Sequence, residues 1–114
     1  SYRSQYRTDN WRYAIKYITN SSDNWVVSTI EDAYSSSFWP RYTSIAIDSN
    51  NKVHISYCAG GLKYVTNASG PWVYTTLDAG NEVGLGTSIG IDKNNKIHIS
   101  YLDVTNQYLK YETN

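Results

Sequence analysis

The stretch TSIAIDSNNKVHISY (residues 43–57) returns almost unchanged as TSIGIDKNNKIHISY (residues 87–101). Twelve of the fifteen positions are identical, and the two copies lie 44 residues apart. Self-similarity at a period of this size is the signature of a repeat architecture. The order of the segments within one repeat therefore predicts the fold.

Two further blocks recur at a spacing of 47 residues. One reads IKYITN, LKYVTN and LKYETN, beginning at residues 15, 62 and 109. The other reads WVVSTI and WVYTTL, beginning at residues 25 and 72. The spacings of 44 and 47 differ because the loop after the second segment varies in length. Each complete repeat thus contains four short segments.

Each segment has the pattern of a β-strand. In KVHISY the apolar or aromatic Val53, Ile55 and Tyr57 alternate with His54 and Ser56, which is the period of two that a strand imposes. Asp, Ser and Asn residues between the segments are typical of hairpin turns, and no stretch shows a sustained helical period. We predict antiparallel strands near residues 43–48, 52–58, 62–67, 72–77, 87–92, 96–102 and 108–113.

Four strands in a unit of about 44–47 residues is the format of a β-propeller blade. We predict an all-β chain of about two and a half blades. Residues 1–42 form a partial blade with an irregular link, residues 43–86 a complete blade, and residues 87–114 a partial blade. Closed propellers have about four to eight blades. We therefore expect residues 1–14 and 104–114 to contact further polypeptide, either the rest of a longer propeller or copies of the same chain.

The composition narrows the class of function. The charges of ten basic and ten acidic residues cancel, so the chain has no net positive charge to attract nucleic acid. No apolar run approaches the roughly 20 residues that cross a bilayer, so membrane insertion is not expected. Twelve Tyr and four Trp in a background rich in Ser, Thr and Asn are typical of polar β-sheet surfaces. This amino-acid composition predicts a secreted or cell-surface protein.

The TSIAIDSNNKVHISY and LKYVTN pattern resembles the HISY-type repeats of secreted bacterial and archaeal proteins, whose tandem copies are taken to form β-propellers. The resemblance covers nearly the whole chain. It implies a lectin-like or adhesive module that binds a glycan or another cell-surface ligand. Because fold alone does not determine function, a structural surface protein that assembles into a ring, layer or filament, and a non-catalytic fragment of a propeller glycoside hydrolase, stay open. The Ser-x-Asp-x-Gly-x-Thr-Trp box of sialidases is absent.

A Ser, a His and an Asp occur in each of the two long repeats, which raises the question of a nucleophilic triad. A catalytic site is a single asymmetric constellation, whereas these residues recur with the repeat. We therefore expect structural residues that form a polar ladder between neighbouring blades. The residues assigned to this role are His54, Ser56, His98 and Ser100. The turns hold one carboxylate each beside a lysine, so neither a metal ion nor another cofactor is expected.

Segments that break the repeat are the better candidates for a binding site. The stretches 6–13 and 31–42 depart from the pattern and are rich in aromatic residues, whose faces stack on sugar rings. We predict a carbohydrate site that draws on Trp11, Trp39, Arg41 and Tyr108. This makes binding, rather than catalysis, the expected activity.

Two Asn-x-Ser triplets stand at equivalent places in the repeats, at Asn20 and Asn67. Both are predicted to lie in the turn between the third and fourth strands, where the side chain would be exposed. They are therefore candidates for N-glycosylation.

Overall fold

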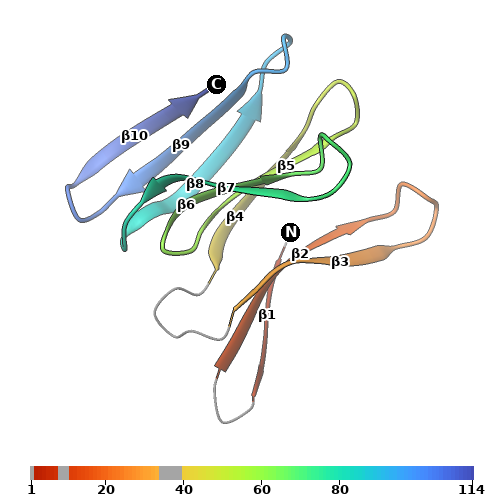
Figure 1. Ribbon diagram of the computed structural model, residues 1–114, viewed down its shortest axis with the longest axis horizontal. Helices are drawn as coiled ribbons and strands as arrows, with labels where there is room; N and C mark the ends of the chain where they lie inside the picture. Colours follow the sequence, from red (N-terminus) through yellow and green to blue (C-terminus); the bar gives the residue numbers. More distant parts are fainter. Residues whose placement is uncertain (1, 8–10, 34–39) are drawn as a thin grey trace.

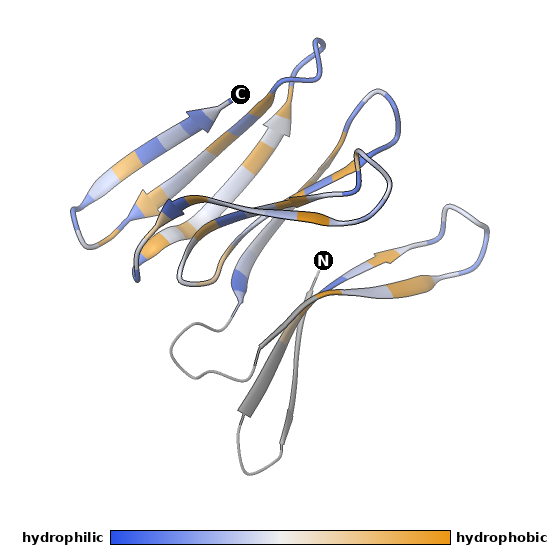
Figure 2. Cartoon of the chain, viewed as in Figure 1, coloured by the Kyte–Doolittle hydropathy of each residue, from blue (hydrophilic) through white to orange (hydrophobic). Residues whose placement is uncertain are grey.

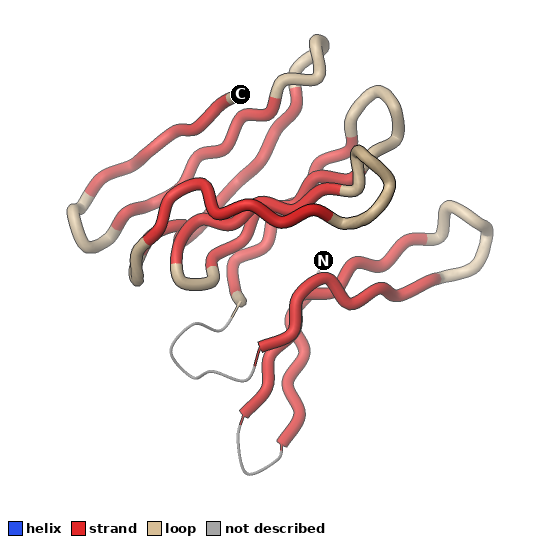
Figure 3. The backbone as a smooth tube through the Cα atoms, in the orientation of Figure 1, coloured by secondary structure: helices blue, strands red, loops and turns tan. Residues whose placement is uncertain are grey.

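The computed structural model describes the backbone of residues 2–7, 11–33 and 40–114, and the side chains of residues 14–30 and 40–114. All regular structure in these residues is β-strand (Figures 1 and 3). The described residues include no helix able to cross a membrane. The strands are β1 (Tyr2–Arg7), β2 (Trp11–Thr19), β3 (Val26–Ala33), β4 (Arg41–Ile47), β5 (Val53–Cys58), β6 (Gly61–Thr66), β7 (Val73–Ala79), β8 (Val83–Ile91), β9 (Ile97–Asp103) and β10 (Tyr108–Thr113).

The strands form three antiparallel sheets. The N-terminal sheet has the order β1-β2-β3, the central sheet β4-β5-β6-β7, and the C-terminal sheet β10-β9-β8. The all-β prediction is confirmed, and each of the seven strands predicted between residues 43 and 113 begins and ends within four residues of its expected bounds. The four repeated segments of residues 43–77 are the four strands of the central sheet.

The strand pairing repeats in the same register from sheet to sheet. A tyrosine of one strand faces the lysine of the Lys-Tyr block in the next strand: Tyr2 with Lys16, Tyr57 with Lys63, and Tyr101 with Lys110. A slip of one residue would turn every side chain to the other face. Equivalent residues of the repeats therefore occupy equivalent positions in the strand pairing of each sheet.

The N-terminal sheet differs from the repeat in one respect. Its first two strands continue beyond the repeated block, with Tyr6 paired to Arg12 and Arg7 to Trp11. The stretch 6–13, expected to be irregular, thus extends a hairpin on both sides of residues 8–10, which lie outside the described residues.

The turn between the first and second strands of each repeat is organised by its aspartate. Asp48 Oδ1 accepts hydrogen bonds from the backbone N–H groups of Asn50 (2.8 Å) and Lys52 (3.0 Å), and Asn51 has a φ of 63°. Asparagine tolerates this left-handed conformation better than most residues. The turn at Asp92 repeats the same two bonds, which explains the shared Asp-x-Asn-Asn-Lys sequence.

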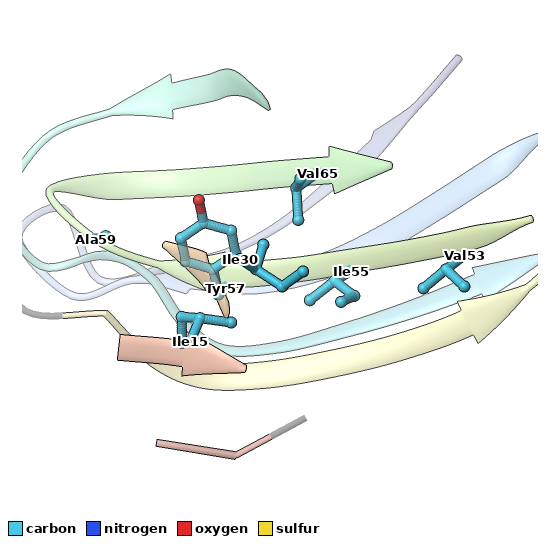
Figure 4. Close-up of a cluster of buried hydrophobic side chains, with 7 residues drawn as sticks. All are labelled: Ile15, Ile30, Val53, Ile55, Tyr57, Ala59 and Val65. Carbon is cyan, nitrogen blue, oxygen red and sulfur yellow. The ribbon is translucent and has the colours of Figure 1, made fainter. Parts of the chain in front are cut away.

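Two clusters of buried apolar side chains hold the sheets together. Figure 2 shows hydrophobic segments along the strands, and Figure 4 shows the first cluster. The first joins the N-terminal sheet to the central sheet through Ile15, Ile30, Val53, Ile55, Tyr57, Ala59 and Val65. The second joins the central sheet to the C-terminal sheet through Leu62, Val83, Ile97, Ile99 and Tyr101. Several members of the second cluster are repeat equivalents of members of the first. Successive sheets therefore pack on one another through corresponding positions.

Strand β8 lies across the central sheet and adds polar contacts to this packing. The Thr87 hydroxyl donates to Ser56 Oγ (2.9 Å) in a buried position, and the backbone N–H of Ile89 donates to Ser44 Oγ (3.2 Å). These bonds satisfy hydroxyl groups that the packing removes from water.

Candidate functional site

His54 links three parts of the central sheet. Its Nε2 lies 2.8 Å from Asp48 Oδ2, and its Nδ1 lies 2.7 Å from the Tyr64 hydroxyl. An ionised carboxylate only accepts hydrogen bonds, so Nε2 carries a proton; in the neutral imidazole Nδ1 then accepts from Tyr64. The imidazole and phenol rings are stacked, with centroids 6.0 Å apart. We call this arrangement the Asp-His-Tyr relay.

The relay recurs in the C-terminal sheet. His98 Nε2 lies 2.9 Å from Asp92 Oδ2, and Nδ1 lies 2.5 Å from the Tyr111 hydroxyl. Each relay joins residues within its own sheet, whereas the sequence analysis expected the histidines to form contacts between neighbouring blades. Of the two serines assigned to the same ladder, Ser56 does bond to the neighbouring sheet, and Ser100 is exposed.

The tyrosines of the relay were missed in the sequence analysis. A signal for them existed, because Tyr64 and Tyr111 occupy the same place in the repeated blocks LKYVTN and LKYETN. The serine that suggested a triad is not part of the relay: the groups bound to His54 are a carboxylate and a phenol.

The contacts of the relay shift the pKa values of two of its members. The hydrogen bond from His54, together with backbone N–H groups of the turn, lowers the pKa of Asp48. Burial raises the pKa of Tyr64, because it disfavours the charged phenolate. The folded-state pKa of Asp48 lies below its ordinary value, so its contribution to stability is present above that value and is lost as the pH falls through the folded pKa.

We expect His54→Ala to lower the free energy of unfolding by about 1–3 kcal/mol, because the partly buried Tyr64 hydroxyl loses its partner. The matched change His98→Ala should have a smaller effect. The side chains of His98 and Asp92 are each 37% exposed, against 6% and 8% for His54 and Asp48, so water can replace the lost contacts. Urea unfolding of both variants at neutral pH measures the difference. A larger loss for His98→Ala would contradict this account.

A second polar group lies at the opposite end of the sheets, where Asp103 is 2% exposed. The Tyr101 hydroxyl donates to Asp78 Oδ2 (2.8 Å), and Lys110 Nζ reaches Asp78 Oδ2 (3.1 Å) and Asp103 Oδ2 (3.3 Å). Asn106 donates twice to Asp103, at 3.2 and 2.9 Å. The group ties β7 of the central sheet to β9 and β10 of the C-terminal sheet.

These contacts shift the pKa of each partner. Hydrogen bonds from Asn106 lower the pKa of Asp103, bonds to the two carboxylates raise the pKa of Lys110, and burial raises the pKa of Tyr101. In the central sheet Ala59 stands at the position equivalent to Asp103. The buried carboxylate is therefore an exception to the repeat, and comparing the repeats position by position would have found it.

Arg41 and Tyr108, two of the four residues predicted to bind carbohydrate, lie at this same end of the sheets. Arg41 Nη2 is 4.0 Å from Glu82 Oε1, and its guanidinium lies 5.4 Å from the centre of the Tyr42 ring. The Glu82 carbonyl accepts a hydrogen bond from the N–H of Val104 (2.9 Å), in the loop that leads to Tyr108. We call this surface, formed by residues 41, 42, 82 and 104–108, the loop end. The other two residues lie outside the described side chains: Trp11 begins β2, and Trp39 falls within residues 34–39.

A pocket of about 80 Å³ opens between the central and C-terminal sheets. It lies beside β10, and its walls are mainly apolar. The lining residues are Tyr64, Leu77, Ile97, Ile99, Glu112, Thr113 and Asn114. This volume is below the roughly 150 Å³ of a cavity that holds benzene, so the pocket suits the edge of a ring rather than a whole sugar.

The two glycosylation candidates differ in the structure. Asn20 is exposed, as expected. Asn67 is partly buried, and its Oδ1 accepts a hydrogen bond from the N–H of Val53 (2.8 Å). Its side chain is therefore part of the sheet, and the expectation of a freely exposed amide was wrong for this residue.

In the part of the chain that the structure describes, no group of three or more His, Cys, Asp or Glu side chains is placed to hold a metal ion. Comparison with family models, curated proteins and solved structures finds no match to this chain.

Proposed function

We propose that this chain is a run of β-propeller blades that acts outside the cell as a glycan-binding or adhesion module. The blade assignment is supported by the equivalence of the two interfaces between sheets. The same repeat positions are buried in each interface: Ile15 and Leu62, Val53 and Ile97, Ile55 and Ile99, and Tyr57 and Tyr101. Side-by-side packing of like sheets through like residues is what radial repetition of blades requires.

The loop end is the proposed binding surface. Tyr108 and Tyr42 are 62% and 50% exposed, so their ring faces are available to stack on a sugar. Arg41 adds hydrogen-bond donors for sugar hydroxyls. The Lys110, Asp78 and Asp103 group holds the adjoining strands in place. The observation that carries the proposal is that Arg41 lies over the exposed ring of Tyr42, at the same end of the sheets as the exposed ring of Tyr108.

Glycan-array binding by the intact chain and by loop-end variants tests this proposal. We expect Tyr108→Ala and Arg41→Ala each to weaken binding about tenfold, which corresponds to the loss of one stacking or charged contact of about 1.4 kcal/mol. Trp25→Ala is the matched control, because Trp25 is 69% exposed but lies at the other end of its sheet. Absence of glycan binding by the intact chain, or an equal loss for Trp25→Ala, would reject the loop end as a glycan site.

A structural role in assembly is a second candidate, supported by the outer face of the C-terminal sheet. Leu102, Leu109 and Tyr111 on this face are 44%, 77% and 60% exposed. Their equivalents in the central sheet are Cys58, Leu62 and Tyr64, and the C-terminal sheet covers them. The exposed face thus repeats a face that is packed elsewhere in the same molecule, as expected of a surface that receives another blade.

A further inference from the structure

The first strand of each of the two long repeats contains a bulge at the same place. In β4 the pairing register shifts between Arg41 and Ser44. In β8 it shifts between Leu85 and Ser88, which lie 44 positions later in the sequence. A bulge leaves one strand with more residues than the strand opposite, and some bulges place a residue in the left-handed backbone region. The two bulges are therefore repeat equivalents.

The two bulges place different residues in the same left-handed conformation. Gly86 has a φ of +61°, which costs glycine nothing. Its repeat equivalent, Tyr42, has a φ of 57°, where the Cβ atom of a bulky residue crowds the backbone. A Cβ atom at Gly86 would meet Leu102 Cδ1 at 3.9 Å, an ordinary contact. The backbone conformation, rather than a lack of space, is thus what disfavours a side chain at this position of the repeat.

Burial of the Tyr42 ring does not offset this strain. Tyr42 is 50% exposed, and it belongs to neither of the two apolar clusters. The guanidinium of Arg41 lies 5.4 Å from the centre of its ring. Residues held in sparsely populated backbone conformations concentrate at ligand sites and active sites. The strain at Tyr42 therefore indicates a role for its ring outside the core.

The charges around Tyr42 disfavour an acidic ligand. Arg41 Nη2 lies 4.0 Å from Oε1 of Glu82, whose side chain is 53% exposed. Lys110, at the same end of the sheets, lies within 3.3 Å of two carboxylates. An acidic group of a ligand would meet these carboxylates, whereas a sugar hydroxyl can accept from a guanidinium and donate to a carboxylate. The described charges at the loop end therefore suit an uncharged ring that carries hydroxyls.

We infer that Tyr42 is the residue of the loop end on which the ligand stacks, and that this ligand is an uncharged sugar. The inference rests on the proposed glycan binding and adds the class of the ligand. The apolar face of the sugar packs on the phenol ring. Arg41 and Glu82, which lie beside this ring, meet the hydroxyls at the edge of the sugar.

A glycan array tests the ligand class and the role of the ring together. It carries neutral oligosaccharides and the same oligosaccharides with a terminal uronic or sialic acid. We expect the intact chain to bind the neutral members at least about tenfold more tightly than the acidic ones. Tyr42→Gly should weaken this binding at least about tenfold, because the ring is lost. Tyr42→Phe, which retains the ring face, should bind within about threefold of the intact chain.

Thermal unfolding separates ligand contact from a structural role of the same residue. Tyr42→Gly should leave Tm unchanged or raise it by up to about 5 °C, because glycine accepts the left-handed backbone. The matched change Gly86→Ala should lower Tm by about 5 °C and leave glycan binding unchanged. An unchanged Tm for Gly86→Ala would show that this position carries no strain and would overturn the inference.

The outcomes distinguish this inference from the proposed function. Weakened glycan binding by Tyr42→Gly without a lowered Tm supports the inference. Undiminished binding by Tyr42→Gly, a lowered Tm for it, an equal loss for Tyr42→Phe, or tighter binding of the acidic oligosaccharides would overturn the inference and leave glycan binding intact. Absence of binding by the intact chain to every member of the array would reject the proposed function, and the inference with it.

Discussion

Leu62→Ala is expected to lower the free energy of unfolding by about 2–5 kcal/mol. Leu62 is fully buried between the central and C-terminal sheets, where it contacts the second apolar cluster. Removing its side chain forfeits the burial of that apolar surface and leaves a cavity that rigid strands on both sides cannot fill. Urea unfolding at neutral pH, followed by circular dichroism, measures the change.

Leu109→Ala is the matched control, since Leu109 occupies the same position in the repeated block but is 77% exposed. Its effect on the free energy of unfolding should stay within about 0.5 kcal/mol. A loss as large as that of Leu62→Ala in dilute solution would contradict the structure. A loss that grows with protein concentration would show that another molecule covers this face, in support of the assembly candidate.

Gly84→Ala is expected to lower the free energy of unfolding by at least about 2 kcal/mol. Gly84 has a φ of +94°, which strains any residue with a Cβ atom. That Cβ would also lie 2.9 Å from Leu62 Cα and 3.0 Å from Leu62 N. Because both atoms belong to the backbone, β8 could accept the change only by moving away from β6. Thermal and urea unfolding both report the loss.

The control for this substitution lies in the same strand. Gly90 does not have a positive φ, and a Cβ atom there would meet no other atom within 4 Å. Gly90→Ala should therefore leave the stability unchanged or raise it by up to about 1 kcal/mol, because alanine restricts the unfolded chain. Destabilisation equal to that of Gly84→Ala would mean that strand propensity, rather than the close approach of the sheets, determines the effect.

The strands and turns could be predicted from the sequence because their causes are local. The alternation in KVHISY depends only on the two faces of a strand, and the turn at Asp48 depends on hydrogen bonds that span four residues. Both copies of the repeat contain the same local information, so each supported the assignment of the other. The extension of β1 and β2 around residues 8–10 was missed because it has no second copy.

The candidate site could be predicted only in part. Arg41 was chosen because it lies in a stretch that breaks the repeat, and Tyr108 as one of the aromatic residues; the prediction that they bind carbohydrate stays a prediction. The partnership of His54 with Tyr64 depends on the pairing of β5 with β6 and on side-chain reach, which the alternation pattern does not specify. Lys110 meets Asp78 only because two sheets lie side by side, so the group that Lys110 forms with Asp78 and Asp103 was not visible in any one segment.

The sequence by itself determined that this chain is a repeating, antiparallel all-β protein, since period-two alternation and turn chemistry act over a few residues. Tertiary structure alone decided the burial of equivalent residues. Leu62 and Leu109 occupy the same place in nearly the same block, LKYVTN and LKYETN, yet one is fully buried and the other is 77% exposed. The physical reason is that burial depends on whether a neighbouring sheet covers the face, and that neighbour belongs to a different part of the chain.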